Sequence, residues 1–155
     1  MKIAGYFDYS FRPIAPFIDA VICSETLGFT EEISFLIDTG ASMTILLDKD
    51  VEIMGLDVSR LKRADKAVGG IGGIVDTYTI DDAKIVFETD EGYISQGLTL
   101  FVGIHDLSRA DEETKRRILT MPSLLGREIT NEFDLHCLPQ RGEVYLEKRL
   151  SKGKF

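Results

Sequence analysis

The stretch Phe35-Leu-Ile-Asp-Thr-Gly-Ala-Ser42 places a carboxylate, Asp38, directly after an apolar run and two residues before a glycine. Apolar residues occupy every second position from Ile33 to Ile37, which predicts a strand with one face in the core. Gly40 lets the backbone turn tightly after that strand and present its amides to the carboxylate. Taken alone, Asp-Thr-Gly is also typical of a plain strand end closed by a turn.

The chain holds one Asp-Thr-Gly and no Asp-Ser-Gly. Two carboxyl groups held close share a proton, so the pair can act as general base and general acid at once. A chain with one such carboxylate needs a second from elsewhere, and an isologous dimer brings a residue near the two-fold axis against its own copy. If Asp38 is catalytic, we therefore expect a homodimer, with the Thr39 hydroxyl available to hydrogen-bond across the axis.

Composition narrows the function classes. The chain has 155 residues, of which 44% are apolar and 28% charged, with a net charge of −8. This balance is typical of one globular domain, and the negative charge argues against nucleic acid as the main partner. No apolar run approaches the length that spans a bilayer, and the N-terminus lacks the apolar stretch of a secretory signal. We expect a cytoplasmic protein with no membrane partner.

Residues 69–73 form a glycine-rich run, Gly69-Gly-Ile-Gly-Gly73. The run lacks the Gly-Lys-Ser/Thr ending of a phosphate-binding loop, and Val75 stands where a dinucleotide-binding pattern requires its third glycine. A mobile hairpin tip is the favoured interpretation, because glycines lower the cost of both positive φ and motion.

Histidines and cysteines are too few for the common metal sites. The chain has two of each, His105, His136, Cys23 and Cys137, without paired ligand spacing. We expect neither a metal nor a cofactor, and two free thiols rather than a disulfide. The same scarcity argues against a Ser–His or Cys–His hydrolase.

The pattern along the chain predicts a mostly β protein with short helices late in the sequence. Residues 1–16 are expected to be irregular, since Pro13 and Pro16 break regular structure. The expected strands cover residues 17–23, 31–38, 43–47, 64–68, 74–80, 84–88, 96–102 and 143–147. The expected helices cover 48–54, closed by Gly55, 108–120, with Ser108 as N-cap, and 126–133. Asp81-Asp82 is expected in a solvated turn, and residues 151–155 in a polar tail.

Three motifs along the chain resemble motifs of a known protein family and occur in the same order. The run from Phe35 to Ser42, the glycine-rich Val68–Ile74 and Leu124-Leu-Gly-Arg-Glu128 are similar to the active-site segment, flap tip and apolar-apolar-Gly element of retropepsin-like aspartic proteases. The resemblance covers roughly Pro16 to Leu146. It implies a single-domain closed β-barrel of the acid protease fold, functional as a homodimer. Two departures stand out: Ser42 replaces a second acidic residue common in retroviral members, and the segment 103–121 is longer than in minimal enzymes.

The resemblance also implies roles for particular residues. The implied catalytic residues are Asp38, Thr39 and Gly40; the substrate-binding residues are Ala41, Ser42, Gly69, Gly70, Ile71, Gly72 and Gly73; and Leu124, Leu125, Gly126 and Arg127 support the site. Without an acid at position 42, Arg127 needs another partner, and its guanidinium fork can hold a carboxylate or backbone carbonyls. The alternative is an ordinary surface arginine.

The sequence thus divides into an N-terminal extension (1–16), a retropepsin-like domain (17–147) and a polar tail (148–155). The expected function is an aspartic endopeptidase in which two Asp38 carboxylates of a homodimer activate water to hydrolyse a peptide bond. The alternative is a dimeric peptide-binding or scaffolding module with the same fold and no catalysis, because fold does not fix function.

Overall fold

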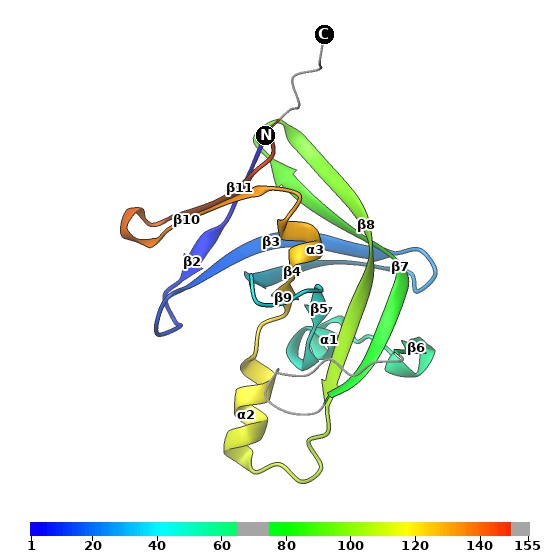
Figure 1. Ribbon diagram of the computed structural model, residues 1–155. Coiled ribbons are helices and arrows are strands. Elements are labelled where there is room, and N and C mark those ends of the chain that lie inside the picture. The colour runs from blue at the N-terminus through cyan, green and yellow to red at the C-terminus, as the bar shows by residue number, and fades with distance from the viewer. Residues whose placement is uncertain (65–74, 150–155) are drawn as a thin grey trace.

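The computed structural model describes residues 1–64 and 75–149 and shows a mostly β chain (Figure 1). Its strands are β1 (Lys2–Ala4), β2 (Tyr6–Asp8), β3 (Ala15–Ser24), β4 (Phe29–Ile37), β5 (Ile45–Leu46), β6 (Lys62–Arg63), β7 (Val75–Thr89), β8 (Gly92–His105), β9 (Leu124–Leu125), β10 (Asp134–Leu138) and β11 (Glu143–Glu147). Its helices are α1 (Asp48–Met54), α2 (Glu112–Thr120) and α3 (Arg127–Thr130), with 3-10 turns η1 (Val58–Arg60) and η2 (Pro139–Arg141).

One large sheet closes on itself. Its strand order is β2-β3-β4-β9-β5-β8-β7-β6, and a further antiparallel pairing of β3 with β7 closes a ring of β3, β4, β9, β5, β8 and β7. Two pairings in this ring are parallel, β4 with β9 and β5 with β8. The short strand β9 therefore lies beside the end of β4, where Asp38 follows, as the predicted closed arrangement requires.

The alternating pattern of β4 is confirmed. Ile33, Phe35 and Ile37 are buried, whereas the residues between them are partly exposed. These side chains join a single large cluster with residues of β3, β7 and β8, including Ile18, Ile22, Ile85 and Leu100. Burial of one face of each strand holds the ring together and fixes the register of β4, because a slip of one residue would turn its core residues outward.

The N-terminal residues are not irregular, contrary to the expectation for 1–16. β1 pairs with β11 in a second sheet of order β1-β11-β10, and β2 pairs with β3 in the large sheet. Ile3 and Phe7 are buried in the main cluster, which explains why these short segments are ordered. Pro16 is tolerated near the start of β3, where it lies opposite Phe7.

β7 and β8 form one long antiparallel hairpin instead of two separate pairs of strands. The predicted turn at Asp81-Asp82 is wrong: these residues lie within β7, where the pairing with β8 shifts register between Ile80 and Ala83. A bulge of this kind bends a strand without ending it, so the polar pair looked like a turn in the sequence. The predicted strand 43–47 shortens to β5, and β10 was not predicted as a strand.

The helix at 48–54 is confirmed, with Gly55 in the left-handed conformation at its C-terminus. Ser108 is not the N-cap of α2, which begins at Glu112. Asp111 caps it instead, because its carboxylate accepts a hydrogen bond from the Thr114 amide at 2.7 Å. The helix predicted at 126–133 is shorter and spans Arg127–Thr130. Across residues 1–64 and 75–149, no helix is long and apolar enough to cross a membrane.

Candidate active site

Asp38 follows β4 and is held in place by β9. Its amide donates to the Leu125 carbonyl at 3.2 Å, continuing the parallel pairing of Leu36 with Leu124 and Ile37 with Leu125. Asp38 is half-buried, whereas Thr39 and Gly40 are exposed. The backbone at Asp38 is therefore fixed by the sheet, while the residues after it face outward.

The carboxylate of Asp38 is only partly engaged. Its Oδ1 accepts a hydrogen bond from the Gly40 amide at 2.8 Å, and its carbonyl accepts one from Ala41 at 3.1 Å, which closes a tight turn. Gly40 therefore presents its amide as the sequence predicted, but without a left-handed φ. Within the described part of the chain, Oδ2 makes no hydrogen bond, so one oxygen is available to a water molecule or to another carboxyl group.

The start of α3 holds the loop after Asp38 from behind. Arg127 donates through its amide to the Ala41 carbonyl at 2.9 Å and through its guanidinium Nη1 to the Thr39 carbonyl at 2.8 Å. The Glu128 amide donates to the Ser42 carbonyl at 3.3 Å. Of the partners considered for Arg127, a carboxylate or backbone carbonyls, the structure shows a backbone carbonyl, that of Thr39.

Gly126 makes a close backbone approach possible. A Cβ atom built there would overlap the backbone of Met43, with its carbonyl oxygen at 2.6 Å. The Gly126 amide donates to the buried Thr44 Oγ1 at 3.0 Å. Any larger residue would push α3 away from the loop, so the apolar-apolar-Gly element supports the site as a spacer between two backbones.

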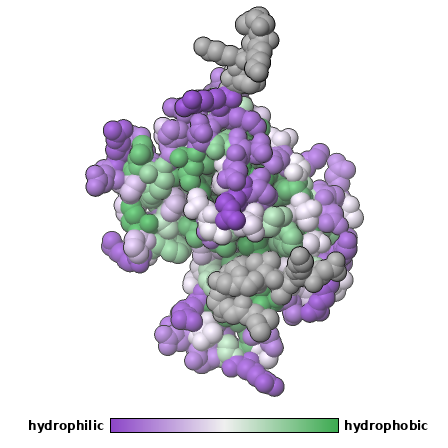
Figure 2. All heavy atoms as spheres, viewed as in Figure 1, coloured by the Kyte–Doolittle hydropathy of each residue, from purple (hydrophilic) through white to green (hydrophobic). Residues whose placement is uncertain are grey.

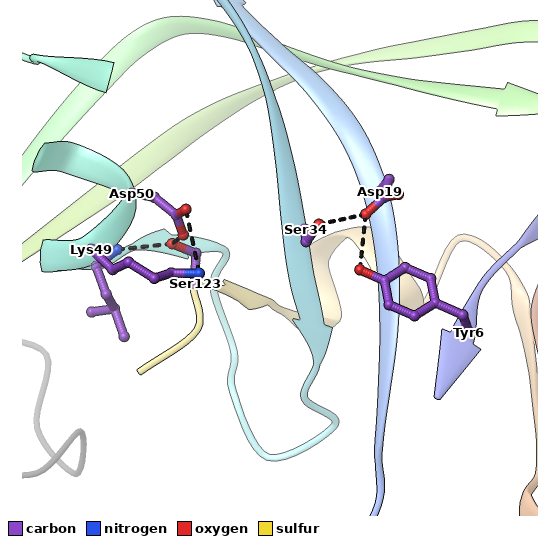
Figure 3. A network of polar contacts seen from close by, with 7 residues as sticks. Tyr6, Asp19, Ser34, Lys49, Asp50 and Ser123 are labelled. Carbon is purple, nitrogen blue, oxygen red and sulfur yellow. Dashed lines mark hydrogen bonds and ion pairs between the residues drawn. The ribbon is translucent and has the colours of Figure 1, made fainter. Parts of the chain in front are cut away.

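The structure also brings to this site polar residues that the sequence did not indicate: Thr44, Asp50 and Ser123 are buried, and Glu128 is half-buried. Glu128 Oε1 accepts the Thr44 amide at 2.5 Å, and Ser123 Oγ donates to Asp50 Oδ2 at 2.6 Å. The second contact is shown in Figure 3 beside Lys49, whose Nζ lies 3.6 Å from Asp50 Oδ1. No sequence motif marks these residues, because their partners are 73 and 84 positions away.

The predicted site residues therefore fall into two groups. The structure gathers at one place Asp38, Thr39, Gly40, Ala41, Ser42, Leu124, Leu125, Gly126 and Arg127. The predicted flap residues Gly69, Gly70, Ile71, Gly72 and Gly73 lie outside the described residues.

A second polar network lies on the outer face of the sheet near β2. The Tyr6 hydroxyl donates to Asp19 Oδ1 at 3.1 Å, and Ser34 Oγ donates to the same atom at 2.7 Å (Figure 3). Partial burial is the main cause that raises the pKa of Tyr6. Tyr6 and Tyr9 remain 40% and 62% exposed, and Figure 2 shows apolar residues at the surface on the side of β2 and β10.

A groove in the described part of the chain lies away from Asp38. This groove of about 870 Å³ runs between the three-stranded sheet and strands β3, β4 and β7, with Asp19, Glu32, Glu88 and Tyr145 among its lining residues. None of the residues from Asp38 to Ser42 lines it. The groove has carboxylates but none held by an adjacent strand and helix as Asp38 is.

Comparison with known proteins identifies solved structures with a similar fold. No protein-family model matches this sequence, and a search of curated proteins finds no match. Among solved structures, a retropepsin-like aspartic protease from Rickettsia conorii is similar over 94% of this chain and 88% of its own, with 20% identity and a TM-score of 0.52. The EIAV protease complexed with the inhibitor HBY-793 aligns over 76% of this chain and 86% of its own, with 18% identity and a TM-score of 0.44.

The chain has the retropepsin-like fold, as the resemblance at Phe35–Ser42 predicted. In this architecture Asp38 stands at the end of a core strand, and β9 and α3 brace it from behind.

Proposed function

We propose that the chain is an aspartic endopeptidase, active as a homodimer, that hydrolyses peptide bonds with a water molecule activated between two Asp38 carboxylates. The observation that supports the proposal most strongly is the hydrogen bonding of the Asp38 carboxylate. Its Oδ1 is fixed by the Gly40 amide, its Oδ2 is unengaged among the described residues, and its backbone is held by β9. A catalytic carboxylate needs this combination of a fixed position and a free oxygen.

The chemistry follows from two such groups meeting. When two carboxyl groups lie close, the like charges prevent both from ionising, so one is a carboxylate and the other a carboxylic acid. The carboxylate takes a proton from the attacking water while the acid protonates the carbonyl oxygen of the peptide. This proposed step requires no cofactor and no covalent intermediate.

The second carboxylate would come from a second copy of the chain. Thr39 and Gly40 are exposed at the tip of the loop, so an isologous contact there brings Asp38 toward its own copy. The register supports a wider contact on the same side. Tyr6 of β2 lies opposite Phe17, which in turn lies opposite Leu36, two residues before Asp38. Phe17 is buried beneath Tyr6, and Tyr6 is 40% exposed, so Tyr6 is the member of this row that a partner could contact.

The proposed substrate is an extended peptide or protein segment. It would lie across the loop formed by Ala41 and Ser42, pairing like an added strand. The proposed substrate contacts of Gly69–Gly73 rest on the sequence alone. We further propose that the enzyme works in the cytoplasm.

The decisive experiment compares the wild type with the Asp38→Asn variant on a diverse peptide library. Asn keeps the shape of the side chain but cannot exchange the proton, so turnover should fall by several orders of magnitude, about 10⁴-fold or more, with the fold and dimer retained. Asp82→Asn is the matched control, because Asp82 lies outside this site, and it should cleave like the wild type. Equal cleavage by wild type and Asp38→Asn would refute the proposal, and peptide binding without cleavage by the wild type would favour the non-catalytic module.

Mixing the two proteins tests the shared site. If each active site needs two Asp38 side chains, wild type equilibrated with an equal amount of Asp38→Asn should lose about half its activity, because half of its subunits enter inactive mixed dimers. Undiminished activity after full subunit exchange, checked by native mass spectrometry, would mean that one Asp38 suffices.

A further inference from the structure

The strand behind Asp38 is very short. β9 contains Leu124 and Leu125, which pair with Leu36 and Ile37. At the two ends of this pairing, the Leu36 amide donates to the Ser123 carbonyl at 2.9 Å and the Asp38 amide donates to the Leu125 carbonyl at 3.2 Å. Two residues cannot fix their own position by strand pairing alone. The contacts at the two ends of β9 therefore determine the position of β9, and through it the position of Asp38.

The first end is held by Asp50. Ser123, immediately before β9, donates from Oγ to Asp50 Oδ2 at 2.6 Å and accepts the Leu47 amide at 3.0 Å. Both Ser123 and Asp50 are buried, and the contact joins β9 to the first turn of α1 (Figure 3). Ser123 therefore uses its hydroxyl for α1 and its carbonyl for the catalytic strand.

The second end is held by Glu128. Gly126, immediately after β9, donates its amide to Thr44 Oγ1, and Thr44 donates its own amide to Glu128 Oε1 at 2.5 Å. Thr44 is fully buried. The other oxygen, Glu128 Oε2, is also buried and has no hydrogen-bond partner among the described residues. A carboxylate thus closes a loop of contacts that runs from the end of β9 through Thr44 to α3.

Both carboxylates cost free energy to bury: Asp50 is a buried residue, and Glu128, although half-buried as a residue, has a buried Oε2 without a hydrogen-bond partner among the described residues. Burying a carboxylate costs free energy unless it is fully paired, and an apolar side chain of similar size often stabilises a fold more. Departures of this kind are expected where function sets the geometry. Here the two costly groups act at opposite ends of the same two-residue strand, directly behind Asp38.

We propose that Asp50 and Glu128 are positioning residues that fix the two ends of β9 and thereby set the position of Asp38. The proposal rests on the proposed function for its effect on turnover. Its structural content is independent of catalysis: without either carboxylate, the Asp38 amide is less firmly bonded to Leu125.

The test uses paired variants at each end. Asp50→Ala and Glu128→Ala remove the accepting oxygens, whereas Asp50→Asn and Glu128→Gln keep one. In both Ala variants kcat should fall by about 10²-fold, the effect of a displaced catalytic group, with KM changed much less. The Asn and Gln variants should recover most of the loss. Asp57→Ala is the control, because Asp57 accepts a bond from Ser59 in a local turn and has no link to β9.

Amide hydrogen exchange provides the readout that does not depend on activity. The Asp38 amide should exchange faster in the Ala variants, measured by NMR relative to amides in the centre of β3, and should return toward wild type with Asn and Gln. If the wild type cleaves nothing, the proposed function fails, but the exchange rates still decide this proposal.

Three results would overturn it: unchanged Asp38 exchange in the Ala variants, a kcat per folded dimer equal to wild type, or Asn and Gln variants no better than Ala. If the Ala variants do not fold, Ser123→Ala replaces them at the first end, since it removes a single hydroxyl. It should show the same faster exchange of the Asp38 amide, and wild-type exchange there would reject the proposal.

Discussion

The hairpin of β3 and β4 has a carboxylate at each end, and the two are used differently. At the open end, Asp38 follows β4 and accepts the Gly40 amide on Oδ1 alone. At the closed end, Asp82 of β7 is hydrogen-bonded to the turn between the two strands. Its Oδ2 accepts a hydrogen bond from the Thr26 amide at 3.0 Å, and its Oδ1 accepts one from the Ser24 hydroxyl at 2.7 Å. Asp82 has both oxygens engaged, and Asp38 keeps one available.

The difference separates a structural carboxylate from a candidate catalytic one. The Thr26 amide, followed by the Ser24 hydroxyl, lowers the pKa of Asp82 to about 2, so this group stays ionised and fixed through the range in which enzymes work. Both oxygens of Asp82 are occupied by hydrogen bonds, so neither is available to a water molecule or a second carboxyl group. At Asp38 the surrounding structure fixes the backbone instead, through β9 and α3, and leaves the carboxylate free to react.

The largest effect is expected from a substitution at Gly126, where α3 begins and the backbone lies against the loop that follows Asp38. Gly126→Ala places a Cβ against the Met43 backbone, which cannot rotate away as a side chain could. We expect the free energy of unfolding to fall by about 3 kcal/mol, the upper part of the range for overpacking, and turnover to fall with it. Chemical denaturation measures the first and peptide cleavage the second.

Gly97→Ala is the matched control, because a Cβ at Gly97 of β8 meets no atom within 4 Å. It should leave both quantities near wild type. If Gly126→Ala is as stable and active as Gly97→Ala, the close approach of α3 to the loop is not needed at the open end.

A smaller effect is expected from Arg127→Ala. Its guanidinium holds the Thr39 carbonyl at the exposed tip, so its loss should loosen the loop without unfolding the chain. We expect turnover to fall by about tenfold, the equivalent of one hydrogen bond made by a charged donor, with little change in thermal stability. Arg60→Ala, an arginine that does not contact the loop, is the control. A loss confined to stability would assign Arg127 to folding and not to the site.

Much of the open end could be predicted from sequence because its signals are local. The alternation from Ile33 to Ile37 predicted β4, and the glycines at 40 and 126 marked the places where backbones turn or approach. The hydrogen bonds that hold the two ends of β9 could not be predicted, because Asp50 and Glu128 contact partners more than 70 residues away in the sequence. Tertiary contacts of this kind leave no periodic pattern.

The N-terminal strands and the bulge of β7 were missed for a related reason. β1 and β2 are three residues each, too short for alternation to be recognised, and they are ordered by partners from β11 and β3. Asp81-Asp82 looked like a turn because two adjacent acids are rare inside a strand. The reason for the second acid is visible only in three dimensions, where it reaches Ser24 and Thr26.

The smallest effect concerns the closed end and depends on pH. The folded pKa of Asp82, about 2, lies below its ordinary value of 3.8, so the folded state binds fewer protons than the unfolded state between these values. Its stabilisation is therefore fully present above about pH 4 and is lost as the pH falls toward 2. Asp82→Asn lacks this contribution at every pH.

The measurement is urea denaturation from pH 6 to pH 2 of two proteins, one with Asp82 and one with Asp82→Asn. Both carry Asp38→Asn so that self-cleavage does not interfere. The difference in free energy of unfolding should be largest above pH 4 and should shrink as the pH approaches 2. Asp81→Asn is the control, because Asp81 makes neither of these hydrogen bonds. A difference that stays constant over the whole range would show that Asp82 does not hold the turn through its charge, and the contrast between the two ends of the hairpin would then fail at its closed end.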